Sequence, residues 1–350
     1  MAKLRYGIIG VGGCGTGKHL ASYSLLKDDV DIIAVCDIRG GRADEIADAY
    51  NVEASFTDYR EMLKSENLDL VSVATPNHLH APITIAALQA GCHVHCEKPA
   101  SLTPALVQSM VAAKNSSGKK LMIGLNNRFT TWAQLAKQWI DAGRLGEIYH
   151  AKCGWKRCRG IPGKGGWFTT KSQSGGGPLI DLGVHFLDVT NYLMGFPVPQ
   201  SVSGQTYSKF ADKQAFNPRA SGYTGTYDVE DLAVGMVRYA NGCTLDLEFS
   251  WASNIEEEYT FVELYGEQGG LKYEKGKLTL IEDFNGTILK MAPCLAQDEN
   301  WGNVETRHFV HCIKNDEEVL SRPEEAVIVM KMICGLYQSA EMGKEVQLKG

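Results

Sequence analysis

Short apolar runs alternate with segments of helical periodicity over the first third of the chain. The apolar runs predict buried strands at Leu4–Ile9, Ile32–Cys36, Leu70–Ala74, His93–Cys96 and Leu121–Gly124. Helix-length segments lie between them at Lys18–Lys27, Arg42–Tyr50, Asp58–Ser65, His80–Ala90 and Pro104–Ser117. This alternation is typical of right-handed βαβ units around a parallel sheet. The pattern therefore predicts a doubly wound α/β domain.

Beyond about residue 125 the pattern changes. Two predicted helices, Thr131–Ala142 and Pro178–Met194, flank a strand at Ile148–Trp155 and a glycine-rich stretch. The strand candidates that follow are Val229–Tyr239, Cys243–Trp251, Tyr259–Tyr265, Gly270–Glu274 and Leu278–Glu282. Turn residues such as Asn241-Gly242 join them, which favours antiparallel hairpins. With closing helices at Val304–Asn315 and Pro323–Met342, we expect two domains, residues 1–124 and 125–350.

Length and composition narrow the class of protein. The 350 residues exceed the size at which one hydrophobic core usually stops growing, and 44% of them are apolar. The formal charge, 35 − 41 = −6, comes without a basic tract, so we expect no nucleic-acid partner. No apolar run approaches the roughly 18–20 residues of a membrane span, and Met1–Gly10 lacks a signal-peptide pattern. Ten cysteines without a disulfide spacing are typical of reduced thiols, which predicts a cytoplasmic protein.

A glycine pattern directly follows the first predicted strand. Residues Gly10–Gly15 (GVGGCG) match G-x-G-x-x-G between a strand and a helix. Such glycines allow a tight turn and let backbone N–H groups approach a pyrophosphate, to which the helix N-terminus adds positive charge. Asp37 ends the second strand 22 residues after Gly15, where an acidic residue accepts hydrogen bonds from the adenosine ribose. The combination predicts a dinucleotide site.

Two alternatives concern which nucleotide this loop binds. Asp37 favours NAD, whereas Arg39 lies two residues later and would bind a 2′-phosphate if the loop moved, so NADP is the less favoured cofactor. Residues Gly12–Lys18 (GGCGTGK) also fit the G-x-x-x-x-G-K of a P-loop. His19, however, stands where a P-loop has the Ser or Thr that binds Mg²⁺, so nucleotide hydrolysis is disfavoured.

Lys98 is the first candidate for chemistry beyond cofactor binding. It follows the strand His93–Cys96 in the tripeptide Glu97-Lys98-Pro99. The carboxyl end of a parallel strand is the place where such sheets bind ligands. A surface ion pair between Lys98 and Glu97 is the alternative.

The second candidate is the segment Gly175–His185 (GGGPLIDLGVH), which runs from a glycine turn into a helix. Asp181 and His185 are four residues apart, so they share one face of the predicted helix, where the carboxylate can orient the imidazole. We expect Gly183 to keep that face open for a ligand. An ordinary solvated polar pair is the alternative.

Together these motifs resemble the Gfo/Idh/MocA oxidoreductase family. The residues that carry the resemblance are Gly10–Gly15, Ala74–His80 (ATPNHLH), Glu97–Pro99, Asn127–Phe129 and Gly175–His185. The resemblance implies an N-terminal Rossmann domain and a C-terminal α/β domain with a large, open, mostly antiparallel sheet. We expect the second domain to bind substrate and to form a homodimer or homotetramer through an apolar open sheet face.

The resemblance also implies an NAD-dependent enzyme that oxidises a CH–OH group of a sugar or glycoside. It assigns catalysis to Lys98, Asp181 and His185, with His185 as the base and Lys98 stabilising the substrate oxygen. The expected cofactor-binding residues are Gly10, Gly12, Gly13, Cys14, Gly15, Asp37, Ile38, Arg39, Thr75, Pro76, Asn77, His80, Glu97 and Lys98. The expected substrate-binding residues are Lys98, Arg128, Trp155, Trp167, Phe168, Asp181 and His185, with core packing as the alternative for the aromatic ones.

Within the family, three segments are similar to bacterial glucoside 3-dehydrogenases, which oxidise the C3 hydroxyl of glucosides. These segments are Gly160–Thr170 (GIPGKGGWFTT), Gly175–Gly183 and the loop Tyr207–Asp231, whose first part is polar and long enough to be functional. We therefore expect C3 oxidation of a glucoside. An inositol dehydrogenase and a non-catalytic NAD-binding sensor are the alternatives, and the complete set of Lys98, Asp181 and His185 argues against the sensor.

We expect no metal site. In Cys92–Cys96 (CHVHC) the side chains of a strand alternate, so the two histidines face away from the two cysteines. Cys153 and Cys158 lack a second pair of ligands at zinc spacing. His78 and His80 are better placed to border the cofactor.

Overall fold

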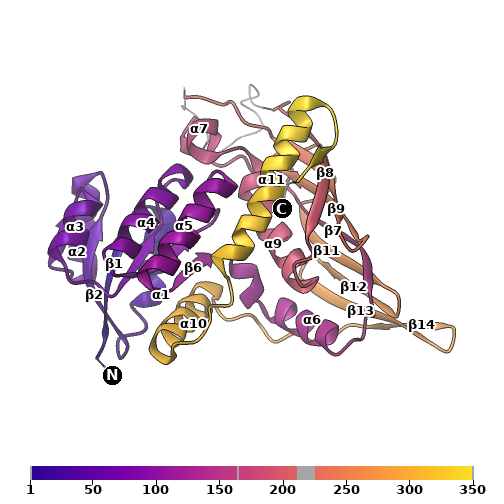
Figure 1. Cartoon of the computed structure of the whole chain (residues 1–350), viewed down its shortest axis with the longest axis horizontal. Coiled ribbons are helices and arrows are strands. Elements are labelled where there is room, and N and C mark those ends of the chain that lie inside the picture. The colour runs from indigo at the N-terminus through magenta and orange to yellow at the C-terminus, as the bar shows by residue number, and fades with distance from the viewer. Residues whose placement is uncertain (1, 164, 211–224, 349–350) are drawn as a thin grey trace. The chain divides into compact units, whose positions relative to one another are not determined.

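The computed structural model describes residues 2–163, 165–210 and 225–348 (Figure 1). The chain forms two compact units. The first comprises Met1–Asn126 with Glu299–Val327, and the second comprises Asn127–Asp298 with Ile328–Gly350. The first division lies two residues from the predicted boundary after residue 124. The predicted second range differs from the units because residues 299–327 return to the first one.

The first unit is built on a six-stranded parallel sheet. Its strands are β1 (Leu4–Ile9), β2 (Val30–Cys36), β3 (Ala54–Phe56), β4 (Leu70–Val73), β5 (His93–Glu97) and β6 (Leu121–Gly124). They lie in the order β3-β2-β1-β4-β5-β6, and every neighbouring pair is parallel. This is the doubly wound order, with its switch point between β1 and β4. The structure thus confirms the predicted Rossmann class.

The helical elements of the first unit are η1 (Gly15–Leu20, a π-helix), α1 (Ala21–Tyr23), α2 (Gly40–Tyr50), α3 (Tyr59–Ser65), η2 (Asn77–Leu79), α4 (His80–Gln89), α5 (Pro104–Ser117) and α10 (Trp301–Asn315). Four of them, α2 to α5, lie close to predicted segments, whereas the helix predicted at Lys18–Lys27 begins and ends earlier, and the one predicted at Val304–Asn315 belongs to this unit and not to the predicted second domain. Helix α5 shows how the sequence sets the ends. The Thr103 side chain accepts a hydrogen bond from Leu106 N, Pro104 begins the helix, and Gly118 ends it with a φ of 67°.

The second unit contains a nine-stranded mixed sheet. Its strands are β7 (Ile148–Lys156), β8 (Pro199–Tyr207), β9 (Leu232–Tyr239), β10 (Thr244–Ser250), β11 (Tyr259–Gly266), β12 (Gly269–Glu274), β13 (Lys277–Phe284), β14 (Thr287–Met291) and β15 (Val346–Gln347). Their order is β14-β13-β12-β11-β7-β10-β9-β8-β15. The β7–β10 pair is parallel and the other pairs are antiparallel. This confirms the expected large, mostly antiparallel sheet.

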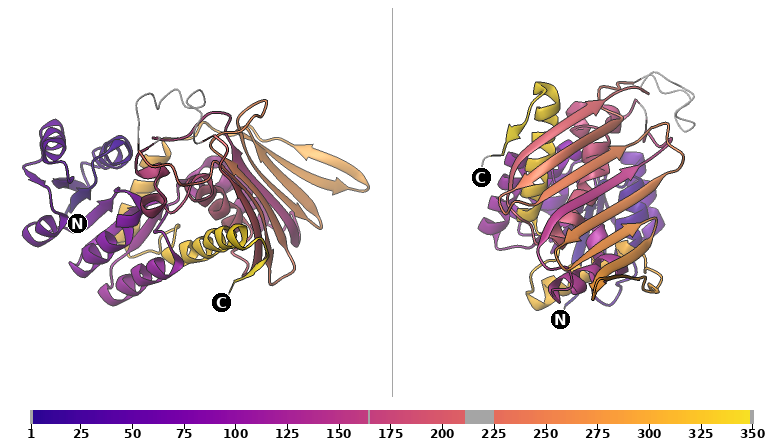
Figure 2. Two further views of the ribbon diagram at one scale, coloured as in Figure 1. Left: turned by 90° about the horizontal axis from the view of Figure 1, so that it is seen from above. Right: turned by 90° about the vertical axis from the view of Figure 1, so that its right-hand side faces the viewer.

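Helices lie on one side of this sheet (Figure 2, right). The helical elements of the second unit are η3 (Asn126–Phe129), α6 (Thr131–Asp141), η4 (Trp167–Thr169), α7 (Lys171–Ser174), α8 (Pro178–Asp181), α9 (Gly183–Leu193) and α11 (Pro323–Met342). Both η3 and α11 begin in the residues of the first unit and continue into the second. Helix α9 packs on β7, where Ala151 and Cys153 are fully buried.

The single helix predicted over Pro178–Met194 is wrong in one respect, because the structure has two helices separated at Leu182. Gly183 opens the second helix and lies directly against the Phe249 ring. A Cβ added to Gly183 would approach that ring to 3.1 Å. Gly183 therefore serves close packing of α9 on the sheet, and the predicted role of keeping a face open for a ligand is wrong.

The sheet face opposite the helices carries charged and aromatic residues. Residues of β7 that alternate with the buried ones point there, and Lys156 binds Glu248 on β10 at 3.3 Å. Lys272 on β12 bridges Glu263 at 3.6 Å and Glu274 at 3.2 Å. The predicted apolar open face is therefore wrong, because β7, β10, β11 and β12 alternate apolar residues with paired charges.

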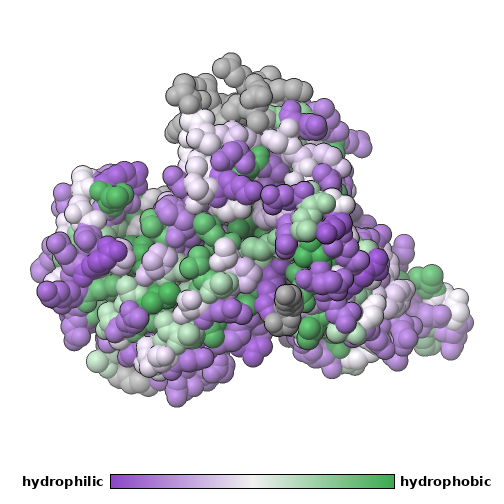
Figure 3. Space-filling model, turned by 45° about the horizontal axis from the view of Figure 1, so that its top comes forward, coloured by the Kyte–Doolittle hydropathy of each residue, from purple (hydrophilic) through white to green (hydrophobic). Residues whose placement is uncertain are grey.

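Apolar residues fill the core of each unit, and others remain on the surface. Among the largest fully buried side chains are Tyr6 and Tyr23 in the first unit and Trp251 and Phe249 in the second. Figure 3 shows patches of hydrophobic residues interspersed with hydrophilic ones on the visible face. Scattered apolar exposure of this kind is normal for folded proteins. Among the described helices, none is both long and apolar enough to cross a membrane.

Candidate functional site

The glycine loop lies at the switch point of the six-stranded sheet, between the ends of β1 and β4. Gly10 has a φ of +93°, and a Cβ there would lie 2.6 Å from Ala74 O. A Cβ on Gly15 would lie 2.0 Å from Gly10 O, so neither position tolerates a side chain. At Gly12 and Gly13 an added Cβ would meet no described atom within 4 Å. The loop is thus tight toward the protein and open at its tip, which fits a pyrophosphate.

Asp37 lies beside this loop and is held as a carboxylate. Its Oδ2 accepts a hydrogen bond from Val11 N at 3.2 Å, and its Oδ1 accepts one from Arg39 N at 3.0 Å. Arg39 also donates through its guanidinium to both oxygens, at 2.9 Å and 3.2 Å. Burial tends to raise the pKa of Asp37, but the hydrogen bonds from Arg39 and Val11 lower it. Arg39 is therefore engaged by Asp37, while the neighbouring Ile38 is 89% exposed.

The segment after β4 supplies the next predicted cofactor residues. The Thr75 hydroxyl oxygen is buried and has no hydrogen-bond partner in the described part of the chain, so it is a candidate to bind a ligand. His80 contacts Pro99 O through Nδ1 at 2.7 Å and Thr75 O through Nε2 at 2.8 Å. Burial lowers the pKa of His80, whereas the contacts with the Pro99 and Thr75 carbonyls raise it, and the ring connects the two loops. Asn77 is buried and Pro76 is partly exposed.

Glu97 belongs to a buried ionic cluster under the glycine loop. Its Oε1 lies 2.5 Å from Lys18 Nζ and 2.8 Å from His19 Nε2, and its Oε2 accepts from Lys98 N at 3.1 Å. Burial would raise the pKa of Glu97, but the Lys18 ammonium and His19 hold it well below its usual range. Burial lowers the pKa of His19 to about 4, so its ring is neutral at neutral pH. By accepting this hydrogen bond from Lys98 N, Glu97 fixes the backbone of Lys98.

Helix α10 completes this cluster. Glu305 is fully buried, and its Oε2 lies 2.7 Å from Lys18 Nζ. Burial disfavours a charged Lys18, but Glu305 and Glu97 together raise its pKa above the ordinary value. Helix α10 also packs on η1 and α1, so this contact is one of several that join residues 299–327 to the first unit.

Potential metal ligands also meet at this cluster. Cys14, His19 and Glu97 bring their ligand atoms within 4.8 Å of one another. The Lys18 ammonium already binds the Glu97 oxygen there, so a cation is in place without a metal.

In the second unit, Asp181 ends α8 and His185 lies in the first turn of α9. Both side chains are half-buried, whereas Leu182, Gly183 and Val184 between them are buried. Asp181 Oδ2 accepts a hydrogen bond from the indole Nε1 of Trp251 at 2.9 Å. Trp251 is fully buried, so it holds the carboxylate from the core side.

The predicted aromatic residues lie in two places, and one of them, Trp155, is near His185. The Trp155 ring centroid is 6.4 Å from that of His185, and the Arg157 guanidinium lies 4.4 Å from the Trp155 centroid. Trp167 and Phe168 stack on one another at 3.8 Å. All three predicted aromatic residues are half-buried, so each keeps accessible surface.

The prediction that Arg128 contacts substrate does not fit its surroundings. Arg128 is fully buried, and its Nε and Nη2 donate to Asp188 at 2.8 Å and 2.5 Å. Its guanidinium also lies 5.1 Å from the Tyr192 centroid and 5.0 Å from that of Phe196. A guanidinium buried in this way supports α9, so we correct its role from substrate binding to structure.

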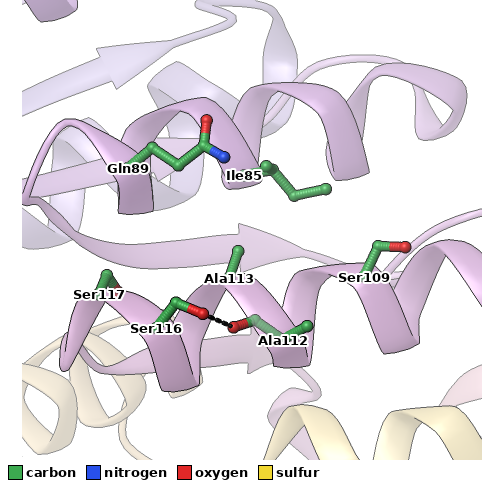
Figure 4. Close-up of a pocket in the computed structure, with 7 residues that line it drawn as sticks. All are labelled: Ile85, Gln89, Ser109, Ala112, Ala113, Ser116 and Ser117. Atoms are coloured by element: carbon green, nitrogen blue, oxygen red, sulfur yellow. Dashed lines mark hydrogen bonds between the residues drawn. The ribbon is translucent and has the colours of Figure 1, made fainter.

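A surface groove between α4 and α5 is separate from these residues (Figure 4). Its lining consists of small, polar or aliphatic residues: Ile85, Gln89, Ser109, Ala112, Ala113, Ser116 and Ser117. No titratable side chain is in this lining. The groove therefore offers no chemistry that competes with the site above.

Family models match both units. Residues 4–125 match the oxidoreductase family with an NAD-binding Rossmann fold, and residues 133–272 match the Gfo/Idh/MocA C-terminal domain. The D-glucoside 3-dehydrogenase of Escherichia coli (strain K12) is 34% identical over 348 residues, which cover 99% of this chain and 98% of that protein. The chain belongs to the Gfo/Idh/MocA oxidoreductase family. The predicted resemblance, enzyme class and NAD cofactor are thereby confirmed.

Two further relatives concern levoglucosan dehydrogenase. The enzyme of Pseudarthrobacter phenanthrenivorans is 29% identical over 290 residues, which cover 78% of this chain and 74% of that protein. A solved structure of levoglucosan dehydrogenase in complex with NADH and L-sorbose superposes with a TM-score of 0.87 at 25% identity, with complete coverage of both chains.

Sequence reasoning missed several residues that support the site. They are Lys18, His19 and Glu305 in the first unit, and Trp251, Glu230 and Tyr337 in the second. In the sequence, Lys18 and His19 stand out only because they fall in an incomplete P-loop pattern, which does not indicate their buried contacts with Glu97. The others act through contacts between distant parts of the chain, such as Trp251 with Asp181.

Proposed function

We propose that this chain oxidises a secondary hydroxyl of a sugar, and specifically the C3 hydroxyl of a glucoside, with NAD as the acceptor. The observation that carries the proposal is the arrangement around Asp181 and His185. Asp181, held by the buried Trp251 indole, and His185, whose ring lies near that of Trp155, occupy half-buried positions four residues apart in one unit. Carboxylates and imidazoles bind hydroxyl groups, and aromatic faces suit the C–H surface of a pyranose. The full-length similarity to a D-glucoside 3-dehydrogenase supports the choice of substrate.

The residues of this chain divide the work of the reaction. Bound NAD supplies the hydride acceptor. His185 removes the proton of the substrate hydroxyl at an imidazole nitrogen. Asp181, fixed by Trp251, binds a neighbouring hydroxyl or orients the imidazole. The family pattern assigns Lys98 to the same oxygen, where its ammonium stabilises developing negative charge.

The first unit provides the residues that would hold the cofactor. The open tip of the glycine loop at Gly12 and Gly13 would bind the pyrophosphate through backbone N–H groups. Asp37 would bind the adenosine ribose, and the Thr75 hydroxyl, which has no partner among the described residues, is available to the cofactor.

The remaining expectations join this proposal. The open sheet face is charged, so it gives no apolar interface to support an oligomer. The proposal of a homodimer or homotetramer therefore rests on the family resemblance alone. A cytoplasmic location is supported by the thiols: all ten cysteines lie among the described residues and none forms a disulfide.

Product identification tests the function. The purified chain is mixed with excess NAD and a methyl β-glucoside, with myo-inositol as the comparison substrate, and NADH absorbance is followed. NMR of the product distinguishes a 3-keto glucoside from other ketones. Oxidation at C3 is the expected result, and turnover of inositol alone contradicts the proposed substrate. If a keto sugar forms only after a second sugar is added as acceptor, the cofactor stays bound between turnovers and the proposal stands.

A further inference from the structure

Glu230 holds the start of the helix that carries Asp181. It is 8% exposed and lies just before β9. Its Oε2 accepts a hydrogen bond from Gly177 N at 2.9 Å, and its Oε1 accepts one from Leu179 N at 3.1 Å. These are backbone donors at the N-terminus of α8, where the helix itself supplies no acceptor. The capping carboxylate thus comes from a residue more than fifty positions along the chain.

Tyr337 on α11 is the third donor to the same carboxylate. Its hydroxyl donates to Glu230 Oε1 at 2.8 Å. A Cβ on Gly176 would lie 2.1 Å from the Tyr337 hydroxyl, and a Cβ on Gly177 would lie 2.0 Å from Glu230 O. The glycines of the GGGP sequence are therefore required because the backbone rests directly on Glu230 and Tyr337.

The same segment also holds Asp181 from its other side. Trp251 N donates to the backbone oxygen of Asp231 at 2.9 Å, and the Trp251 indole donates to Asp181 Oδ2 at 2.9 Å. Asp181 N in turn donates to Gly177 O at 3.0 Å. The contacts close a ring through Glu230, Gly177, Asp181, Trp251 and Asp231. Both the main chain and the side chain of Asp181 are therefore tied to residues 230–231.

Residues just before Glu230 hold the short helix η4, which contains Trp167 and Phe168, in the same way. The Thr169 hydroxyl donates to Thr226 O at 2.8 Å, and Asp228 Oδ1 accepts from Lys171 N at 2.6 Å. These bonds fix Thr169 and Lys171, which directly follow Trp167 and Phe168 in the chain. One short stretch, residues 226–231, thus sets the position of two parts of the candidate site.

We propose that Glu230 and Tyr337 are positioning residues, which set the placement of Asp181 through the N-terminus of α8 without touching the substrate. The proposal rests on the proposed function, in which Asp181 takes part in sugar oxidation. Misplacement of a reacting group by about 1 Å can cost roughly 100-fold in rate. Loss of one donor to the Glu230 carboxylate is therefore expected to lower kcat and leave the binding of NAD in the other unit unchanged.

Tyr337→Phe is the principal variant, because it removes a single oxygen atom and preserves the packing of α11. Tyr239→Phe is the matched control, since the Tyr239 hydroxyl is also buried and donates to Asn191 Oδ1 at 3.0 Å, away from α8. We expect Tyr337→Phe to lower kcat about 10-fold with KM for NAD unchanged, and Tyr239→Phe to stay within about 2-fold of the wild type. Glu230→Gln, which weakens all three bonds, is expected to have the larger effect. A kcat of Tyr337→Phe equal to that of the wild type overturns the proposal.

A spectroscopic measurement separates this inference from the proposed function. The ¹⁵N–¹H resonance of the Trp251 indole, assigned by its loss in Trp251→Phe, reports on the hydrogen bond to Asp181. It is expected to shift in Tyr337→Phe and to stay in place in Tyr239→Phe. An unchanged resonance in Tyr337→Phe overturns the positioning role whatever the activity. If the wild type oxidises no sugar but the resonance shifts, the proposed function fails and the placement of Asp181 by Tyr337 stands.

Discussion

Two buried carboxylates, Glu97 in the first unit and Glu230 in the second, are held in opposite ways. Glu97 faces the Lys18 ammonium, which with His19 keeps its pKa well below the usual range in spite of burial. Among the described residues Glu230 receives only neutral donors, two backbone N–H groups and a hydroxyl, and burial raises its pKa. The first arrangement compensates charge, and the second fixes the geometry of the donors. We therefore expect changes around Glu97 to affect stability and changes around Glu230 to affect the reaction.

Removing the Lys18 ammonium from the Glu97 cluster is expected to have the largest effect on stability. Lys18→Met leaves the carboxylates of Glu97 and Glu305 buried together without their ammonium partner. Loss of one partner of a buried pair costs about 3–5 kcal/mol, which we expect to find in urea unfolding. Lys3→Met is the control, because the Lys3–Asp31 pair is exposed and is expected to contribute less than about 1 kcal/mol. Equal losses in the two variants would contradict charge compensation at Glu97.

Arg128 extends the comparison to the second unit. Arg128→Lys loses the two-pronged contact with Asp188, so we expect a loss of about 2–4 kcal/mol in the free energy of unfolding and no change in KM for the sugar. Arg144→Lys, at a partly exposed pair with Glu282, is the control and is expected to cost about 0–1 kcal/mol. An unchanged stability with a raised KM for the sugar would restore the role in substrate binding.

The Glu97 cluster is expected to make the free energy of unfolding depend on pH in the acid range. The pKa of His19 is about 4 in the folded chain, against an ordinary value of 6.5 for a solvated histidine, so folding disfavours its protonation. The stability it contributes is present above pH 6.5 and is lost as the pH falls toward 4, by about 2–3 kcal/mol. Glu97, whose pKa is also lowered, adds a loss that begins below about pH 4.5. The free energy of unfolding of His19→Gln should depend less on pH between 6.5 and 4.5, and an unaltered slope would show that folding does not lower the pKa of His19.

Asp37 gives the smallest expected effect. Asp37→Ala removes the acceptor for the ribose and releases Arg39, so KM for NAD should rise about 10-fold and the preference over NADP should narrow. Steady-state kinetics with both cofactors measure this. An unchanged ratio of the two kcat/KM values would remove Asp37 from the ribose site.

The parts of the fold that follow from local pattern were predictable from the sequence. Strands such as Leu4–Ile9 and Leu121–Gly124 are buried apolar runs, and α11 begins and ends where its apolar spacing does. The missed strands lack this signal: β3 has three residues and β15 two, β8 reads PQSVSGQTY, and β14 is exposed at four of its five positions.

The candidate site divides along the same line. Gly10–Gly15, Asp37, Asp181 and His185 lie in contiguous motifs whose chemistry can be read locally. Glu230 and Tyr337 are 107 residues apart, and Lys18 meets Glu305 from the far end of the chain. Such contacts depend on tertiary packing, which no local pattern encodes. The burial of Arg128 has the same origin, because its partner Asp188 is 60 residues away.

The role of His185 as the base is tested by the turnover of a β-glucoside with NAD, measured in parallel for the wild type, His185→Ala and His150→Ala. His150 is the control, since it lies on the charged sheet face beside Thr244. The account predicts a 3-keto glucoside from the wild type, a loss of about 10²–10⁴-fold in kcat for His185→Ala, and wild-type kcat for His150→Ala. A kcat for His185→Ala close to that of the wild type would contradict it.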